Sequence, residues 1–376
     1  RIHPDLVGTK DGETVDRLLR ACVHCGFCNA VCPTYQVLGD EADGPRGRIW
    51  LIADLFEHDR PTFTQQRHLD RCLTCRACET ACPSGVQYGA LLELARPRIE
   101  QHLGRSVTDR FMRWGFRRIV PRPGVFTRVV SLARRLGPLL PKGWRDQLPP
   151  ADPNGGARSI FPPVPESVPA DVPAYEARHE ERTVVLLEGC VQRAATPAVN
   201  AAARRVLAHL GVRVVTLPRE RCCGALPEHL GAPEEARVLA RANVTQAAEQ
   251  LDRGAEAILS TASGCGLAWK DYGELLEGDR GREAIHRVAA ATRDLGEYIL
   301  ARCDVDRLSN HAPAPDVPRR IAWQAPCTLQ HGQRADGAVA EVLAAAGAEL
   351  VPVEAPEACC GSAGTYSLLQ PQLARD

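Results

Sequence analysis

Eight cysteines near the start of the chain form two copies of one motif. The first copy comprises Cys22, Cys25, Cys28 and Cys32 and is followed by Pro33. The second comprises Cys72, Cys75, Cys78 and Cys82 and is followed by Pro83, so that each position lies 50 residues after its counterpart. Both copies read C-x2-C-x2-C-x3-C-P, which is the spacing of cysteines that hold [4Fe-4S] clusters. The sequence therefore predicts two such clusters.

The fourth cysteine of each motif is expected to serve the other cluster. Three cysteines on one tight loop can wrap one corner of a cluster, and in two-cluster ferredoxins the fourth ligates the neighbouring cluster. We assign one cluster to Cys22, Cys25, Cys28 and Cys82, and the second to Cys72, Cys75, Cys78 and Cys32. The alternative is a pair of four-thiolate zinc sites, which rarely use two runs of this kind. We expect His24 to be a neighbour of the first cluster and not a ligand.

Seven further cysteines belong to a second repeat. Cys190 and the pair Cys222-Cys223 recur 137 residues later as Cys327 and the pair Cys359-Cys360, and each pair is followed by glycine. Cys265 has no counterpart, because its equivalent would fall at position 402, beyond Asp376. We predict a metal or redox site in each copy; the alternative is that these thiols pack as small apolar side chains. Packing is what we expect of Cys303, and hydrogen bonding is what we expect of His331.

The apolar pattern predicts the elements that position these cysteines. In the N-terminal part it indicates helices at residues 46–57 and 89–102. In the first Cys-Cys-Gly copy we expect strands at 183–187, 212–217 and 257–261 and helices at 197–210 and 234–251. In the second copy we expect strands at 320–323 and 350–353 and a helix at 338–346. Such alternation is typical of small α/β units with parallel sheets, whose strands would deliver the cysteines to one sheet edge.

These observations predict an α+β multidomain protein of five segments. They are an α-helical ferredoxin-type domain with two [4Fe-4S] clusters (1–105), a basic amphipathic segment (106–146), a Pro-rich linker (147–181), a first Cys-Cys-Gly module (182–315) and a second, incomplete module (316–376). Between positions 105 and 145 there are eleven Lys or Arg residues and one acid, among large apolar residues. Such a segment suits peripheral contact with an anionic membrane. The alternative is that it docks on a partner subunit or covers the chain's own domains.

Composition restricts the class of protein. The 376 residues include 46 basic and 46 acidic side chains, so no net charge attracts the chain to nucleic acid. No run approaches the roughly 18 apolar residues of a membrane-spanning helix. Sixteen cysteines in a chain of this length indicate metal ligation in a reducing compartment, so we expect a cytoplasmic protein. The sequence begins at Arg1 and not at methionine, so we expect the natural N-terminus to be missing.

Two ferredoxin motifs joined to two Cys-Cys-Gly modules resemble the iron-sulfur subunits that serve flavin dehydrogenases and heterodisulfide reductases. The stretches CVHCGFCNAVCPTYQVLGDEADGPRGRIWLI and HLDRCLTCRACETACPSGVQYGALLE most resemble the iron-sulfur subunit family of bacterial glycolate oxidase. The resemblance implies that FAD on a partner flavin-containing subunit oxidises glycolate to glyoxylate. Electrons would then pass through this chain toward a quinone, at the cytoplasmic face of the inner membrane. The chain would be part of an enzyme without being catalytic alone, and it has no G-x-G-x-x-G fingerprint for a dinucleotide.

The same resemblance leaves two other functions open. One is a catalytic thiol/disulfide subunit of the heterodisulfide reductase type. The family pattern ends in C-x-x-C, whereas this chain has Ala262 and retains only Cys265, which counts against that function. The other is the iron-sulfur subunit of anaerobic glycerol-3-phosphate dehydrogenase, which shares the architecture.

Overall fold

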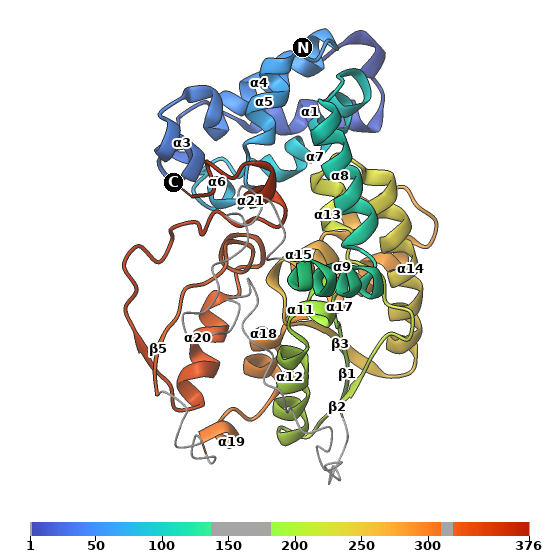
Figure 1. Cartoon of the computed structure of the whole chain (residues 1–376), viewed down its shortest axis with the longest axis vertical. Coiled ribbons are helices and arrows are strands. Elements are labelled where there is room, and N and C mark those ends of the chain that lie inside the picture. The colour runs from blue at the N-terminus through green and yellow to red at the C-terminus, as the bar shows by residue number, and fades with distance from the viewer. Residues whose placement is uncertain (1, 137–181, 310–318, 376) are drawn as a thin grey trace.

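The computed structural model describes residues 2–136, 182–309 and 319–375. A helical N-terminal part occupies one end of the molecule, and two α/β parts lie at the other end (Figure 1). The chain then returns from the second α/β part to the helical part, where the C-terminal end lies near α6 (Ala77–Thr80). The expected linker, 147–181, lies outside the described residues, as do positions 137–146 of the basic segment.

Short helices wrapped around one apolar core make up the N-terminal part. Besides α6 they are η1 (Pro4–Leu6), α1 (Lys10–Ala21), α2 (Phe27–Ala30), α3 (Pro33–Leu38), η2 (Glu41–Asp43), α4 (Pro45–His58), α5 (Phe63–Asp70) and α7 (Tyr88–His102). The core takes Leu18 from α1, Ile52 and Leu55 from α4, and Leu91 and Leu92 from α7, all of them buried. The helices expected at 46–57 and 89–102 are confirmed as α4 and α7, and α7 continues through Pro97.

Two helices connect this part to the rest of the chain. They are α8 (Val107–Ile119) and α9 (Pro123–Leu136), and both are amphipathic. Arg105 and Arg113 anchor the start of α8 to the helical part, where both lie within ion-pair distance of Asp70 and Glu100. At the other end α9 packs against α11 (Cys190–Ala195). The described part of the basic segment therefore covers the chain's own domains, and two of its arginines are not available to a membrane.

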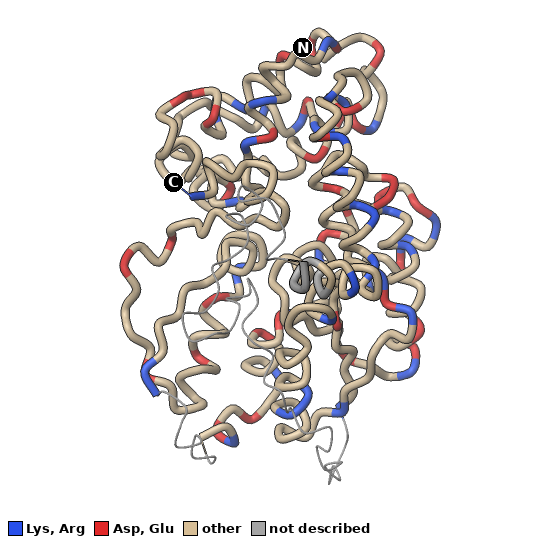
Figure 2. The backbone as a smooth tube through the Cα atoms, viewed as in Figure 1, with Lys and Arg blue, Asp and Glu red and all other residues tan. Residues whose placement is uncertain are grey.

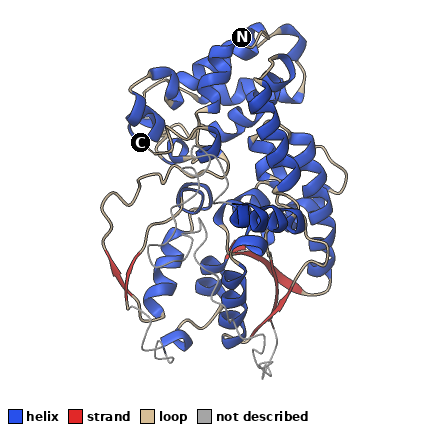
Figure 3. Cartoon of the chain, in the orientation of Figure 1, coloured by secondary structure: helices blue, strands red, loops and turns tan. Residues whose placement is uncertain are grey.

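A four-stranded parallel sheet forms the centre of the first α/β part. Its strands are β1 (Arg182–Leu186), β2 (Val212–Val215), β3 (Ala255–Ser260) and β4 (Thr292–Asp294), in the order β2-β1-β3-β4 (Figure 3). The expected strands at 183–187, 212–217 and 257–261 are confirmed. The edge strand β4 was not expected from the sequence, because it is only three residues long and all three are polar or charged.

Helices cover both faces of this sheet, because alternate residues of β1 point to opposite sides. Val184 and Leu186 face α12 (Pro197–His209) and α18 (Leu295–Arg302). Val185 faces α14 (Pro233–Asp252) and α17 (Arg282–Ala291), together with the ring pair Trp269–Tyr272. The ring pair belongs to α15 (Ser263–Lys270) and α16 (Tyr272–Leu275). The remaining helix, α13 (Ala225–His229), contacts α7 of the helical part.

The second α/β part is a smaller version of the first. Its two parallel strands are β5 (Arg320–Ala322) and β6 (Glu349–Val351), with η4 (Thr328–Gln333) and α20 (Asp336–Ala345) between them. The expected elements are therefore confirmed with boundaries shifted by two residues or fewer. Two short helices, α19 (Asp306–Ser309) and α21 (Tyr366–Leu369), flank this part. It packs on the first part through α20, where a Cβ atom on Gly296 of α18 would lie 2.7 Å from Val339.

The distribution of charged residues and the length of the helices bear on possible contacts of the described residues. Figure 2 shows basic and acidic residues intermingled along the helical part and both α/β parts. Among the residues that the structure describes, no helix has the length and apolar character needed to cross a bilayer.

Candidate metal centres

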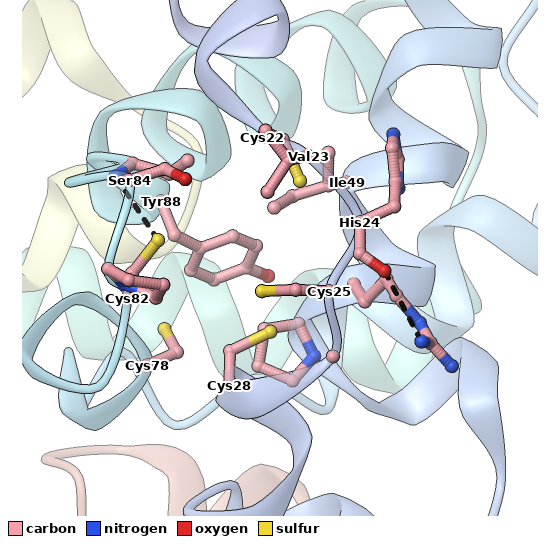
Figure 4. A pocket seen from close by; sticks show the side chains of 15 residues that line it. Cys22, Val23, His24, Cys25, Cys28, Ile49, Cys78, Cys82, Ser84 and Tyr88 are labelled. Atoms are coloured by element: carbon pink, nitrogen blue, oxygen red, sulfur yellow. Dashed lines mark hydrogen bonds between the residues drawn. The ribbon is translucent and has the colours of Figure 1, made fainter.

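The first group of thiols surrounds a pocket at the surface of the helical part. Five cysteines line it: Cys22, Cys25 and Cys28 from the first motif and Cys78 and Cys82 from the second (Figure 4). Ile49 and Tyr88 close the pocket on its apolar side. Cys25 is exposed, so this group lies at the edge of the protein. Burial and then the charges of Cys22 and Cys82 raise the pKa of the Cys28 thiol.

The second group of thiols lies deeper. Burial and then the charges of Cys72, Cys75 and Cys32 raise the pKa of the Cys78 thiol, which places these four sulfurs close together. Three of the four, Cys32, Cys72 and Cys78, are buried. Cys78 also lines the pocket of the first group, so the two groups adjoin each other.

The two loops that carry the cysteines repeat each other in backbone conformation. His24 and Gly26 flank Cys25 with φ of 53° and 85°, and Thr74 and Arg76 flank Cys75 with φ of 55° and 61°. Left-handed residues on both sides turn the chain sharply around the central cysteine of each motif. Only one of the four is glycine, so three other residues are held in an uncommon conformation. His24 is exposed, and its carbonyl accepts a hydrogen bond from Arg46 at 3.5 Å.

The first Cys-Cys-Gly module brings its four cysteines together at the carboxyl edge of the sheet. Cys190 follows β1, Cys222 and Cys223 follow β2, and Cys265 follows β3. All four cysteines pack in one cluster on the same face of the sheet, and neighbouring thiols act on one another's pKa. Interaction with Cys190, and then with Cys223, lowers the pKa of the Cys222 thiol, since it stabilises the thiolate. The expected convergence at one sheet edge is therefore found.

Three residues that the sequence analysis did not identify hold this thiol group in place. Asn243, fully buried on α14, accepts a hydrogen bond from the Arg221 amide at 2.8 Å and donates one to the Cys222 carbonyl at 3.1 Å. The Tyr272 hydroxyl donates to the Cys223 carbonyl at 2.9 Å. The Glu220 carboxylate accepts from the Gly189 amide at 2.8 Å and so ties the Cys190 loop to the Cys222 loop. The sequence features that could have identified two of them are polar side chains, Asn243 and Tyr272, at positions of helices where an apolar residue is expected.

The second module brings together fewer thiols, and they lie beside the helical part. Interaction with Cys359, followed by burial, raises the pKa of the Cys327 thiol, and the charge of Cys360 adds to this effect. The charge of Cys359 contributes to raising the pKa of Cys75 to about 12, after burial and the charge of Cys72. The second module therefore lies next to the second thiol group of the helical part. The Tyr366 hydroxyl donates to the Arg71 carbonyl at 3.1 Å across the same junction.

The glycine of each Cys-Cys-Gly motif has a steric explanation. Gly224 and Gly361 have φ of 96° and 67°, in the left-handed region. A Cβ atom at Gly224 would lie 3.2 Å from the Ala236 carbonyl, and one at Gly361 would lie 2.5 Å from the Ala374 carbonyl. The paired cysteines thus turn tightly against a neighbouring segment in both modules.

The remaining candidates have ordinary structural roles. Cys303 packs at the margin of the core between the sheet, α12 and α18. His331 Nδ1 lies 3.2 Å from the Thr80 hydroxyl, which makes it a contact between the second module and the helical part. Asp40, Asp43 and His68 form a carboxylate–imidazole group, but Asp43 already binds Arg48 and Arg71.

The donor sets fit iron-sulfur clusters. Four thiols around one point are the ligand set of a [4Fe-4S] cluster, and the helical part provides two such groups. The first Cys-Cys-Gly module provides a third group of four thiols, and the second module provides three thiols.

Comparison with known proteins agrees with this interpretation of the sites. Residues 18–86 match the family model described as a 4Fe-4S dicluster domain, and residues 184–270 and 321–376 match the cysteine-rich domain. The chain is 44% identical to the glycolate oxidase iron-sulfur subunit of Escherichia coli K12, over 96% of this chain and 83% of that protein. It is 32% identical to a probable glycolate oxidase iron-sulfur subunit of Bacillus subtilis, over 94% of this chain and 80% of the relative.

A more distant relative carries a different activity. It is one of the subunits of the dihydromethanophenazine:CoB–CoM heterodisulfide reductase of Methanosarcina barkeri, 27% identical over 98% of this chain and 84% of the relative. Coverage is similar for these relatives, and the higher identity lies with the glycolate oxidase subunits. With a 4Fe-4S dicluster domain followed by cysteine-rich domains, the chain belongs to the family of glycolate oxidase iron-sulfur subunits.

Proposed function

We propose that this chain is the electron-transfer subunit of a flavin-dependent glycolate oxidase. It receives electrons from FAD on a partner subunit that oxidises glycolate to glyoxylate, and it passes them toward a quinone. The observation that carries this proposal is the placement of two four-thiol groups, one opening to the surface at Cys25 and one buried against the second module. Clusters bound there would supply one-electron transfer.

We assign the ligand sets as the repeated motif predicts, with the fourth cysteines crossed. Cys22, Cys25, Cys28 and Cys82 hold one [4Fe-4S] cluster, and Cys72, Cys75, Cys78 and Cys32 hold the second. The segment boundaries given above complete this proposal: 1–105 carries both clusters, 182–315 and 316–376 are the two modules, and 106–146 and 147–181 connect them.

The modules offer further ligand sets. Cys190, Cys222, Cys223 and Cys265 are four thiols on three loops at one sheet edge, suited to an additional iron-sulfur cluster or another thiophilic metal. Cys327, Cys359 and Cys360 form a smaller set beside Cys75, in position to exchange electrons with the second cluster.

A second candidate function has one observation in its favour. The four thiols of the first module lie together although Ala262 replaces the first cysteine of the family's C-x-x-C pattern. A catalytic thiol/disulfide centre of the heterodisulfide reductase type would need such a group. We rank it below glycolate oxidation because the chain shares more sequence with glycolate oxidase subunits.

Reconstitution with a flavin partner tests the proposal. The chain is purified anaerobically and mixed with the flavin-containing subunits of a glycolate oxidase, and cluster reduction is followed by absorbance and electron paramagnetic resonance (EPR). We expect about eight iron atoms from the two motifs, and reduction by glycolate only when the flavin subunits are present. Purified protein with zinc and no iron would overturn the cluster assignment. Oxidation of glycolate by the chain alone would overturn the division of labour.

A further inference from the structure

A buried arginine lies against the second thiol group. Arg48, on α4, is 1% exposed, and its Nη1 atom is 3.9 Å from the Sγ atom of Cys32. Its Nε atom donates to the His68 carbonyl at 2.8 Å, and Nη2 donates to the Thr34 hydroxyl at 3.0 Å. These bonds hold the guanidinium in one orientation, with one edge toward the cysteine.

The charge of Arg48 is only partly balanced. Asp43, with no exposed surface, lies 3.4 Å from Arg48 and 2.7 Å from Arg71, so one buried carboxylate serves two guanidinium groups. His68 Nδ1 lies 3.0 Å from the same carboxylate. A buried charge without full compensation costs free energy, so a packing role does not explain Arg48. The thiolates of a bound cluster would supply the missing negative charge.

The first thiol group has a different electrostatic environment. Its neighbouring arginine, Arg46, lies two positions before Arg48 on the same helix but is partly exposed, and its Nε atom binds Glu41 at 2.7 Å. Solvent also reaches Cys25. The first group is therefore screened by water and has a neutralised cation, whereas the second is shielded from water and has a cation beside one of its sulfurs.

We propose that Arg48 is a positioning residue that raises the reduction potential of the cluster held by Cys32, Cys72, Cys75 and Cys78. This inference rests on the proposed electron-transfer function. Burial opposes the extra negative charge of a reduced cluster, and a nearby fixed positive charge favours it. The guanidinium stays protonated throughout, so it offsets the cost of burial without exchanging a proton. With clusters bound at both sites, one electron would leave the first cluster, oxidising it, and enter the second, reducing it.

Redox titration of the full anaerobic chain, monitored by EPR, tests this role without any partner or substrate. Arg48→Gln should lower the ratio of reduced to oxidised second cluster at least tenfold at a fixed ambient potential, which is 59 mV for a one-electron couple. The first cluster should be unaffected, and Cys25→Ser identifies its signal. Arg48→Lys should restore part of the difference, and the matched control Arg46→Gln should leave the second cluster unchanged.

A variant expected to shift the second cluster's potential in the opposite direction keeps the test decisive if Arg48→Gln does not assemble. Asp43→Asn removes the shared negative charge while keeping the side chain's shape, so it should raise the second cluster's potential. The inference is overturned if Asp43→Asn lowers the second cluster's potential or leaves it unchanged, or if a well-assembled Arg48→Gln raises it or leaves it unchanged. It is also overturned if the well-assembled variants shift both clusters equally. If these shifts occur but glycolate reduces neither cluster through a flavin partner, the proposed function fails and the role of Arg48 stands.

Discussion

Arg76 Nη2 lies 2.7 Å from Asp271 Oδ2, and this ion pair joins the loop of Cys75 to the first Cys-Cys-Gly module. Arg76 also lies 3.8 Å from Glu93 on α7. Its charge acts on Glu228 from α13 as well, so one arginine partly neutralises carboxylates from both sides of the junction. Arg76, which directly follows Cys75, therefore binds the cysteine loop of the helical part to the first Cys-Cys-Gly module.

Removing this arginine should destabilise the junction. Arg76→Gln removes the main cation from a cluster of carboxylates. Because the Arg76–Asp271 pair is partly exposed, we expect a loss of up to about 3 kcal/mol. Denaturant unfolding followed by circular dichroism measures this loss. The control is Arg287→Gln, whose exposed pair with Asp252 should be worth less than about 1 kcal/mol. Equal losses in both variants would contradict the structural role of Arg76.

Glu228 should contribute stability that is lost as the pH rises between about 4.5 and 7. Burial, followed by the charge of Asp271, raises the pKa of Glu228 from 4.5 to about 7. The folded chain therefore binds more protons than the unfolded chain in this range, so the stabilisation is complete below the unfolded pKa and is lost as pH rises through the folded one. The slope of the free energy of unfolding against pH should be less negative, or more positive, in Glu228→Gln than in the wild type. The exposed carboxylate of Glu283 provides the control, because Glu283→Gln should leave the slope unchanged.

The crossed arrangement of the fourth cysteines makes a spectroscopic prediction. Cys82→Ser should alter the cluster of Cys22, Cys25 and Cys28, and Cys32→Ser should alter the cluster of the second motif. EPR spectra of the reduced variants distinguish the two clusters. Cys303→Ser, outside both groups, should leave both signals intact. Damage confined to the motif that carries each substitution would contradict the crossing.

Asn243 should control access to the thiols of the first module. In Asn243→Ala the Arg221 amide and the Cys222 carbonyl lose a buried partner, at about 1–3 kcal/mol for each unsatisfied group. The Cys222–Cys223 turn should loosen, so both thiols of the cluster-free protein should react faster with a thiol reagent. Gln246 makes a similar pair of hydrogen bonds to Arg219 one turn further along, but at the surface. Gln246→Ala is therefore the matched control and should leave thiol reactivity unchanged.

The sequence predicts those elements and sites that depend on residues close together in the chain. The strands before the cysteines are found because a short apolar run predicts a buried strand, and β1 and β3 are such runs. The strand β4 is not predicted because Thr292 and Asp294 are polar and become buried only through the packing of α17 and α18. Arg48 is not predicted because an arginine on a helix is expected at the surface, and its partners come from separate segments. Arg105 and Arg113 look available in the sequence because their partners Asp70 and Glu100 belong to other segments of the chain.

These ion pairs change which part of the basic segment a membrane could contact. Arg113 is buried, and Arg117 lies 3.7 Å from Glu235. The outer face of α8 instead presents exposed Arg110 and Arg118, with Phe111 and Trp114 between them and their rings stacked at 5.9 Å. Basic and aromatic residues on one face of a helix suit an anionic lipid surface.

Exchange of the two exposed arginines tests whether this face contacts lipid. Each basic residue near an anionic surface contributes about 1 kcal/mol, so the double variant Arg110→Gln, Arg118→Gln should lose about 2 kcal/mol of binding, roughly 30-fold in affinity. Sedimentation with vesicles containing phosphatidylserine measures this, and the wild type should bind less in high salt. The matched control Arg128→Gln removes an exposed arginine from α9 and should bind nearly as well as the wild type. If the double variant keeps its vesicle affinity but no longer binds the flavin subunits, the outer face of α8 is a subunit interface and the membrane proposal is wrong.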